Sequence, residues 1–130
     1  EVADFAGLAR RNPLAAFAML IFMFSLTGIP PTAGFIGKFY VFMAAVNAGL
    51  TWLAVTGVVF TAISAYFYLR VVMLMYMKEP DPTIRMAASP ASVAVLTVAA
   101  AAVLLIGIYP APFLEYAQNA ILTIHSPLTP

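Results

Sequence analysis

The sequence predicts an all-α, polytopic membrane protein with one broken transmembrane helix, two continuous transmembrane helices and a short C-terminal amphipathic helix. Hydrophobic residues make up 64% of the 130 residues and charged residues only 8%, whereas a soluble domain is about a quarter charged. The apolar residues gather in four long runs, separated by proline, glycine or polar segments. So few charges cannot cover a water-facing surface. A bilayer therefore explains the composition better than a buried, soluble helical core.

Composition also narrows the classes of function. A net charge of +1 without a basic stripe argues against nucleic-acid binding. The absence of cysteine excludes disulfides, thiolate chemistry and cysteine-ligated clusters in this chain. The polar start, EVADFAGLARRNP, lacks an initiator methionine and indicates a piece of a longer protein rather than a signal peptide. No phosphate loop, metal-ligand spacing or nucleophile–base set is visible, so we expect no cofactor and no metal in this chain.

The first predicted element is the broken transmembrane helix over residues 13–48. Asn12 and Pro13 form an N-cap and first-turn pair. The apolar run that follows is interrupted by the sequence GIPP at Gly28–Pro31, and a second apolar run continues after it. Each run would be about 25 Å long as a helix, close to a bilayer core of about 30 Å. Length alone therefore leaves open a hairpin of two crossings or one interrupted crossing.

The placement of the basic residues favours one interrupted crossing. In a hairpin, Arg10 and Arg11 would lie across the membrane from Lys78 and Arg85. In a single crossing, all four basic residues fall on the same side, as the positive-inside rule favours. The sequence therefore predicts that these four residues are cytoplasmic and that the C-terminus is periplasmic.

The later elements follow in order along the chain. Residues 50–77 and 90–109 are the two continuous transmembrane helices, the second beginning with the N-cap pair Ser89-Pro90. Between them lies the polar loop KEPDPTIRMAA. Residues 111–125 are predicted to form an interfacial helix, because one face is apolar and the other polar. The apolar face holds Phe113, Ala117, Ile121 and Ile124, and the polar face holds Glu115, Gln118 and Asn119.

The interruption itself is a candidate site. Pro30 and Pro31 lack backbone donors, so the carbonyls of about Leu26–Thr27 lose their usual helical partners. Irregular backbone at membrane depth persists where protein buries it or where it lines a wet cavity. Transporters of ions and protons use such helix ends as binding dipoles, although a packing kink is an alternative. Gly34 and Gly37 offer a small face that a neighbouring helix or water can approach.

Lys38 favours a proton site over a packing kink. It is the one charged residue between Arg11 and Arg70 and lies one to two turns past the break. Placing a lysine near the bilayer centre costs about 2.5–3.5 kcal/mol. Burial favours the neutral amine and a nearby carboxylate favours the charged form, so a lysine balanced between them can exchange its proton. Snorkelling is the alternative, but the helix end is about 13 Å away.

No carboxylate in this chain is placed to pair with Lys38, so its partner, if any, is expected to be another lysine, a histidine or water from the part of the protein upstream of this chain. Four nearby hydroxyls either relay protons through water or bond the backbone one turn back. These belong to Ser25, Thr27, Thr32 and Tyr40. Arg70, among tyrosines, is typical of a snorkelling arginine in an aromatic belt. His125 and Glu115 are expected at the polar surface.

Two stretches of the sequence are specific enough to indicate a family. The stretch FAGLARRNPLAAFAMLIFMFSLTGIPPTAGFIGKFYVFMAAVNAGL resembles the C-terminal part of the antiporter-like subunit N family of bacterial respiratory complex I, the NADH–quinone oxidoreductase. SLTGIPPTAGFIGKFYVF is its most specific part, and AISAYFYLRVVMLMYM continues it. The resemblance covers essentially the whole chain.

The resemblance implies a fold of two inverted repeats, each containing a broken helix, of which residues 13–48 would be the second. It implies that Lys38 carries protons toward the periplasmic side of the bacterial inner (plasma) membrane. FMN, the iron–sulfur clusters and quinone would be bound by other subunits. The implied partners are the neighbouring antiporter-like subunit M, small subunits such as K, the lipid bilayer and protons.

The resemblance therefore implies a proton-translocating membrane subunit that couples quinone reduction to proton pumping through Lys38. It would be part of an enzyme, although the chain itself carries no redox centre. Two sister subunits fit less well: subunit L carries a long lateral helix, and subunit M usually has glutamate where Lys38 stands. A multisubunit cation–proton antiporter and a purely structural membrane scaffold are the alternatives.

Overall fold

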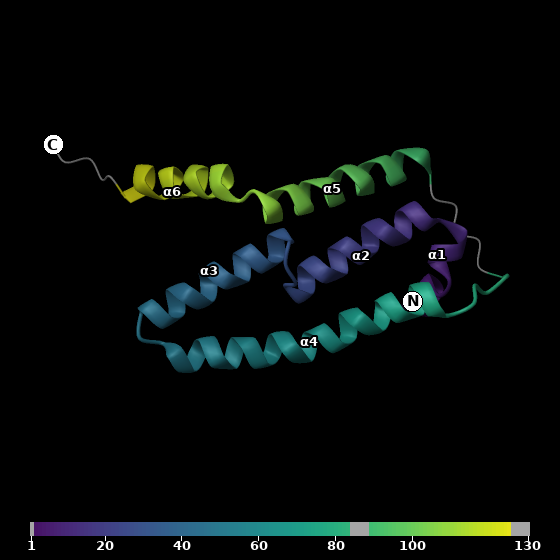
Figure 1. Cartoon of the computed structure of the whole chain (residues 1–130), viewed down its shortest axis with the longest axis horizontal. Coiled ribbons are helices and arrows are strands. Elements are labelled where there is room, and N and C mark those ends of the chain that lie inside the picture. The colour runs from purple at the N-terminus through teal and green to yellow at the C-terminus, as the bar shows by residue number, and fades with distance from the viewer. Residues whose placement is uncertain (1, 84–88, 126–130) are drawn as a thin grey trace.

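The computed structural model describes residues 2–83 and 89–125, and every regular element in these ranges is a helix (Figure 1). This confirms the predicted all-α class. Arg85, which was predicted to be cytoplasmic, lies outside the described residues. The elements are η1 (Val2–Phe5), α1 (Leu8–Arg11), α2 (Pro13–Thr27), α3 (Ala33–Asn47), α4 (Thr51–Met77), α5 (Pro90–Ile108) and α6 (Ala111–His125).

The helices α2 and α3 lie end to end and run in the same general direction (Figure 1). The helix α4 runs back beside both of them, and α5 packs on their other side. Residues 13–47 therefore form one interrupted helix between two continuous ones, rather than an antiparallel hairpin. The short helices η1 and α1 pack against the end of α4 and the start of α2.

Two N-caps predicted from the sequence set where the helices begin. The Ala15 N–H donates to the Asn12 side chain at 3.2 Å, directly before Pro13. The Ser92 N–H donates to Ser89 Oγ at 3.2 Å, at the start of α5. Each cap satisfies a backbone donor that the first helical turn cannot satisfy itself.

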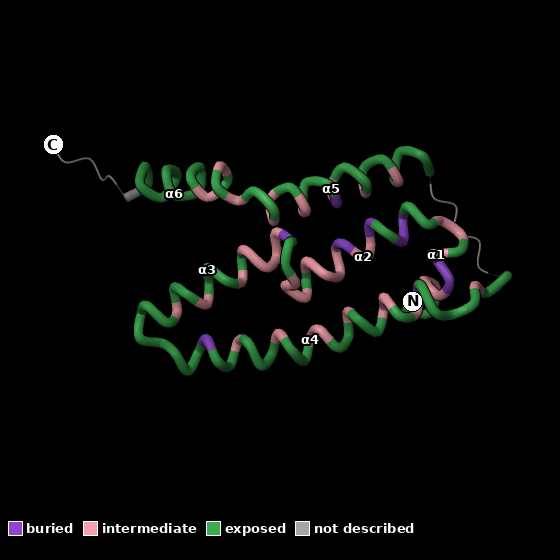
Figure 2. Tube along the Cα trace, viewed as in Figure 1, coloured by how far each residue is buried: buried purple, intermediate pink, exposed green. Residues whose placement is uncertain are grey.

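Buried side chains are few and gather around α2. One cluster joins Leu8, Ala16 and Met75, and the other joins Ala18 and Ile21 to Ala100 of α5. Figure 2 shows that α4 and α5 are exposed along most of their length, and both are long and apolar enough to cross a membrane. Such extended apolar surfaces need lipid or further protein to cover them.

The helix α6 continues past the end of α5 in Figure 1 instead of turning across it. Its amphipathic pattern predicted a helix over residues 111–125, and α6 has those bounds. A helix in the interface would lie across the axis of α5. The interfacial position therefore stays a prediction.

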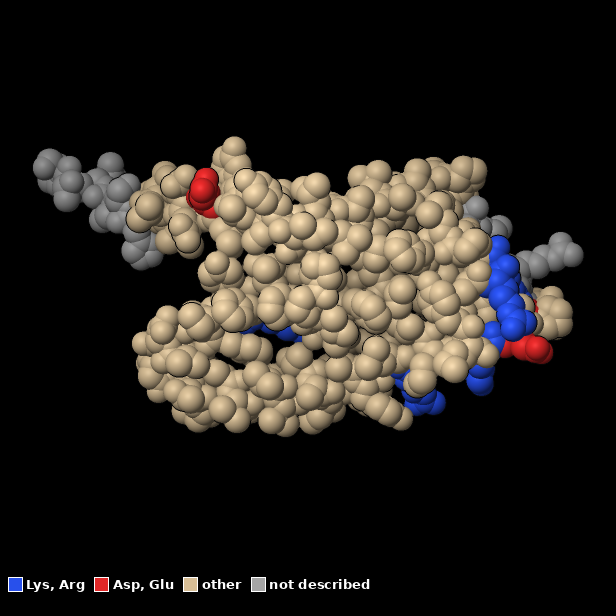
Figure 3. Space-filling view, in the orientation of Figure 1, with Lys and Arg blue, Asp and Glu red and all other residues tan. Residues whose placement is uncertain are grey.

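The polar loop after α4 is tied to the end of α1. Arg10 lies 3.9 Å from the Glu79 carboxylate, and the Arg11 guanidinium donates to the backbone carbonyl of Asp81. The Thr83 hydroxyl, its N–H and then the Arg11 charge hold the pKa of Asp81 below its ordinary value. Basic side chains cluster at this end of the molecule (Figure 3). Arg10 and Arg11 thus lie at the same end as the loop that begins at Lys78.

Near its C-terminal end, α5 approaches the break between α2 and α3. A Cβ atom added at Gly107 would lie 2.0 Å from the Pro31 carbonyl oxygen, too close for any side chain. Because a methyl group would collide with backbone rather than with a flexible side chain, Gly107 allows this contact. The helix α5 thereby supports the irregular segment from one side.

We predict that Gly107→Ala destabilises the full-length protein by about 1–3 kcal/mol, because α5 must move away from the break. The matched control is Gly37→Ala, since nothing lies within 4 Å of a Cβ at Gly37. That control should be neutral or stabilising by about 0.5–1 kcal/mol through helix propensity. The measurement is the thermal unfolding midpoint in detergent. Equal midpoints for the two variants would contradict the contact.

Candidate functional site

The backbone at the end of α2 leaves two carbonyl groups without helical donors. In a continuous helix, the carbonyls of Leu26 and Thr27 would accept from residues 30 and 31. Both of these are proline and have no N–H. The Gly28 N–H instead closes the helix on Phe24 and Ser25, at 2.9 and 3.1 Å. Gly28 itself adopts φ +86°, the left-handed conformation that ends many helices.

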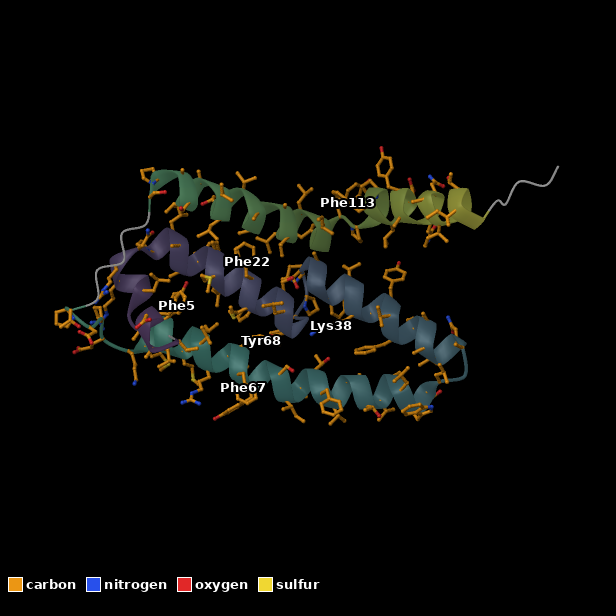
Figure 4. The ribbon with its side chains drawn as sticks, turned by 180° about the vertical axis from the view of Figure 1, so that it is seen from behind. Phe5, Phe22, Lys38, Phe67, Tyr68 and Phe113 are labelled. Atoms are coloured by element: carbon orange, nitrogen blue, oxygen red, sulfur yellow. The ribbon has the colours of Figure 1, made fainter. Side chains whose placement is uncertain are left out.

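The Lys38 ammonium binds these two carbonyls. Its Nζ donates to the Leu26 oxygen at 2.6 Å and to the Thr27 oxygen at 3.2 Å. The side chain comes from the second turn of α3 and reaches back across the break (Figure 4). A cation at a helix C-terminus also interacts favourably with the helix dipole, and charge-assisted hydrogen bonds are stronger than neutral ones. Within the described residues, backbone oxygens are thus the partners of Lys38.

Three small residues, Ser25, Gly28 and Gly34, allow this geometry. The Gly34 N–H donates to Ser25 Oγ at 3.0 Å, so the last turn of α2 lies beside the first turn of α3. A Cβ at Gly34 would lie 1.8 Å from the Ser25 carbonyl oxygen. A Cβ at Gly28 would lie 2.9 Å from Lys38 Cδ. The neighbour that approaches Gly34 is therefore the end of α2 itself, whereas Gly37 faces open space in the described chain.

Three of the four hydroxyls proposed as a relay take part in hydrogen bonds among the described residues, and that of Ser25 accepts from the Gly34 N–H. The Thr27 hydroxyl donates to the Met23 carbonyl at 2.8 Å. The Thr32 hydroxyl donates to the Ile29 carbonyl at 2.7 Å, and Thr32 is only 3% exposed. Tyr40 is exposed, with its ring packed edge-on against Phe39. These bonds match the backbone-bonding alternative for Thr27 and Thr32, and a relay through water stays a prediction.

The other sequence candidates lie away from the break. Arg70 and Glu115 are exposed, on α4 and α6 respectively, and the side chain of His125 is outside the described residues. Sequence reasoning missed Gly107, since a glycine in an apolar run gives no sign of what it contacts. Among residues 2–83 and 89–125, no group of three or more carboxylate or histidine side chains could hold a metal ion.

We predict that Ser25→Ala lowers the free energy of local opening at the junction between α2 and α3 by about 1 kcal/mol, because the Gly34 N–H loses its acceptor. Amide hydrogen exchange of residues 33–36 in the full-length protein should then become about fivefold faster. The control is Thr56→Ala, which removes a hydroxyl that, in the part of the chain that the structure describes, bonds the Trp52 carbonyl of its own helix. If Ser25→Ala exchanges no faster than this control, Ser25 does not hold the junction.

The comparison with known proteins agrees with this architecture. The family profile described as "NADH:quinone oxidoreductase/Mrp antiporter, TM" matches residues 1–64. The chain is 50% identical over 128 residues to "NADH-quinone oxidoreductase subunit N 1" of Chloroherpeton thalassium, and 51% identical over 121 residues to "NADH-quinone oxidoreductase subunit N" of Trichlorobacter lovleyi. These alignments cover 93% and 92% of the chain and 25% of each relative.

A solved structure, the respiratory complex I of Thermus thermophilus with bound aureothin, contains a similar chain. The likeness has a TM-score of 0.80 at 34% identity and covers 85% of this chain and 26% of that one. The chain spans about a quarter of the length of these relatives. The family profile, the curated relatives and the solved structure agree, so the chain is a membrane-embedded protein that belongs to the subunit N family of NADH–quinone oxidoreductases.

Proposed function

We propose that this chain is part of a proton-translocating membrane subunit of NADH–quinone oxidoreductase, in which Lys38 carries the proton. The observation that carries the proposal is the pair of hydrogen bonds from Lys38 Nζ to the Leu26 and Thr27 carbonyls, at 2.6 and 3.2 Å. Known relatives named as subunit N of this enzyme support the assignment to the complex.

The site suits a proton that must be held and then released. A lysine ammonium has three N–H donors, and two of them reach the carbonyls at the end of α2. The third donor remains for water or for a residue of the longer protein. The two carbonyls at the end of α2 hold the amine in place by charge-assisted hydrogen bonds, and the free donor is where a proton would leave it. A change of charge near the free donor would then release the proton.

The redox reaction supplies that change of charge from elsewhere in the complex. FMN, iron–sulfur clusters and quinone are proposed to bind other subunits, and this chain's own part is to hold and move the proton at Lys38 Nζ. Tyr40 makes no hydrogen bond among the described residues, so we propose its hydroxyl as a water contact on the exit route. Subunit M and small subunits such as K are the proposed neighbours.

The ends of the helices indicate the proposed orientation. Arg10, Arg11 and the loop from Lys78 lie together at one end of the molecule, and the turn at Asn47–Leu50 lies at the other (Figure 1). The positive-inside rule places the basic end in the cytoplasm. The proton at Lys38 would then leave toward the periplasm, past the second half of the broken helix.

A second candidate is a subunit of a multisubunit cation–proton antiporter. The matching family profile includes antiporters of this type as well as NADH–quinone oxidoreductases. In an antiporter, the same lysine would exchange its proton against a cation. Transport would then respond to a sodium gradient and would not require NADH.

We predict that Lys38→Ala in the reconstituted complex lowers NADH-driven proton pumping to below about a tenth of the wild-type value, because the proton carrier is removed. Lys38→Arg keeps a charge at the break and should preserve assembly, but its guanidinium does not release a proton, so pumping should also fall. The measurement is the proton-to-NADH ratio in vesicles, with the amount of assembled complex determined in parallel.

Two outcomes separate the alternatives. Full pumping by Lys38→Ala and Lys38→Met would contradict the proton site and leave a structural scaffold. Sodium-dependent proton transport without NADH oxidation would favour the antiporter.

A further inference from the structure

Two basic residues near the end of α4 differ from the other described cations, each of which has a salt-bridge or hydrogen-bond partner. Arg10 pairs with Glu79, Arg11 donates to the Asp81 carbonyl, and Lys38 binds the break. Arg70 and Lys78 make no salt bridge or hydrogen bond within the described residues. They stand eight residues apart on α4 and its C-cap, and therefore on one face of the helix.

Both residues line a cavity of about 410 Å³ between the N-terminal segment and α4. One wall is Val2, Ala3 and Ala6, and the other is Phe67, Val71 and Leu74. The two walls are held together by the Gly7 N–H, which donates to the Leu74 carbonyl at 3.1 Å. The cavity is thus an apolar slot with positive charges at Arg70 and Lys78.

This combination fits one kind of occupant. We propose that the slot binds an anionic phospholipid, with its phosphate on Arg70 and Lys78 and an acyl chain between the two walls. The guanidinium can hold two phosphate oxygens at once, and an acyl chain would pack between the two apolar walls. Basic pockets beside membrane helices bind lipid head groups in this way. The proposal is independent of the role of Lys38.

Charge complementarity favours a lipid over other occupants. A free phosphate would use the two cations but leave the apolar walls uncovered, and an apolar helix would cover the walls but leave the cations unpaired. A phospholipid satisfies both parts of the slot. The position also suits a lipid, because Arg70 lies about two turns from the polar end of α4, where Lys78 stands.

The test measures lipid bound to the intact complex carrying the full-length subunit. Delipidated complex is titrated with phosphatidylglycerol or phosphatidylcholine in detergent, and bound lipids are counted by native mass spectrometry. The double variant Arg70→Gln/Lys78→Gln should bind one phosphatidylglycerol about tenfold more weakly than the wild type does. At low lipid concentration, its count of bound phosphatidylglycerol should therefore be lower by one. The matched control is Arg10→Gln, which removes a cation already paired with Glu79 outside the slot, and it should bind lipid as the wild type does.

A second variant keeps the test decisive if the double variant fails to assemble. Val71→Trp fills the slot but keeps both cations, so it should also lose the bound phosphatidylglycerol. Inorganic phosphate should compete poorly, because it gains nothing from the apolar walls. An unchanged lipid count in both variants would overturn the proposal, and it would indicate that upstream helices of the subunit fill the slot. Equal binding of phosphatidylcholine, or complete displacement by phosphate, would overturn it as well.

Discussion

The contact between the Lys38 ammonium and the carbonyls of Leu26 and Thr27 is the interaction on which the arrangement of this chain depends. Two consecutive prolines leave these carbonyls without donors, and an unsatisfied carbonyl in an apolar environment is costly. An unpaired lysine in the same environment is energetically unfavourable as well. Each group satisfies the other, so the break and the charge are stable together where neither would be stable alone.

The surrounding helices keep this contact in place. Ser25 joins the two halves through the Gly34 N–H, and Gly28 leaves room for the lysine stem. The helix α5 reaches the break through Gly107, while α4 runs beside both halves. The irregular backbone is therefore covered on two sides by regular helices, as irregular backbone at membrane depth requires.

The exposed surfaces describe the rest of the environment. Large apolar side chains such as Phe60 and Val98 are 64% and 70% exposed, which fits a chain that spans about a quarter of its relatives. The free donor of Lys38 marks where further protein or water can meet the break. Arg70 and Lys78 mark a different contact, at the polar end of α4, where lipid chemistry fits better than a protein partner.

The sequence by itself determined the helical membrane class, the two N-caps and the loss of donors at Leu26 and Thr27. These follow from composition and from local chemistry, since a proline lacks its N–H in any surroundings. The sequence also pointed to Lys38, and the proton partner expected upstream of this chain stays a prediction. Only the tertiary structure decided that the lysine turns back twelve residues to the Leu26 carbonyl, and that Gly107 meets Pro31 across seventy-six positions. Such distant contacts depend on how whole helices pack, and no local pattern of residues encodes them.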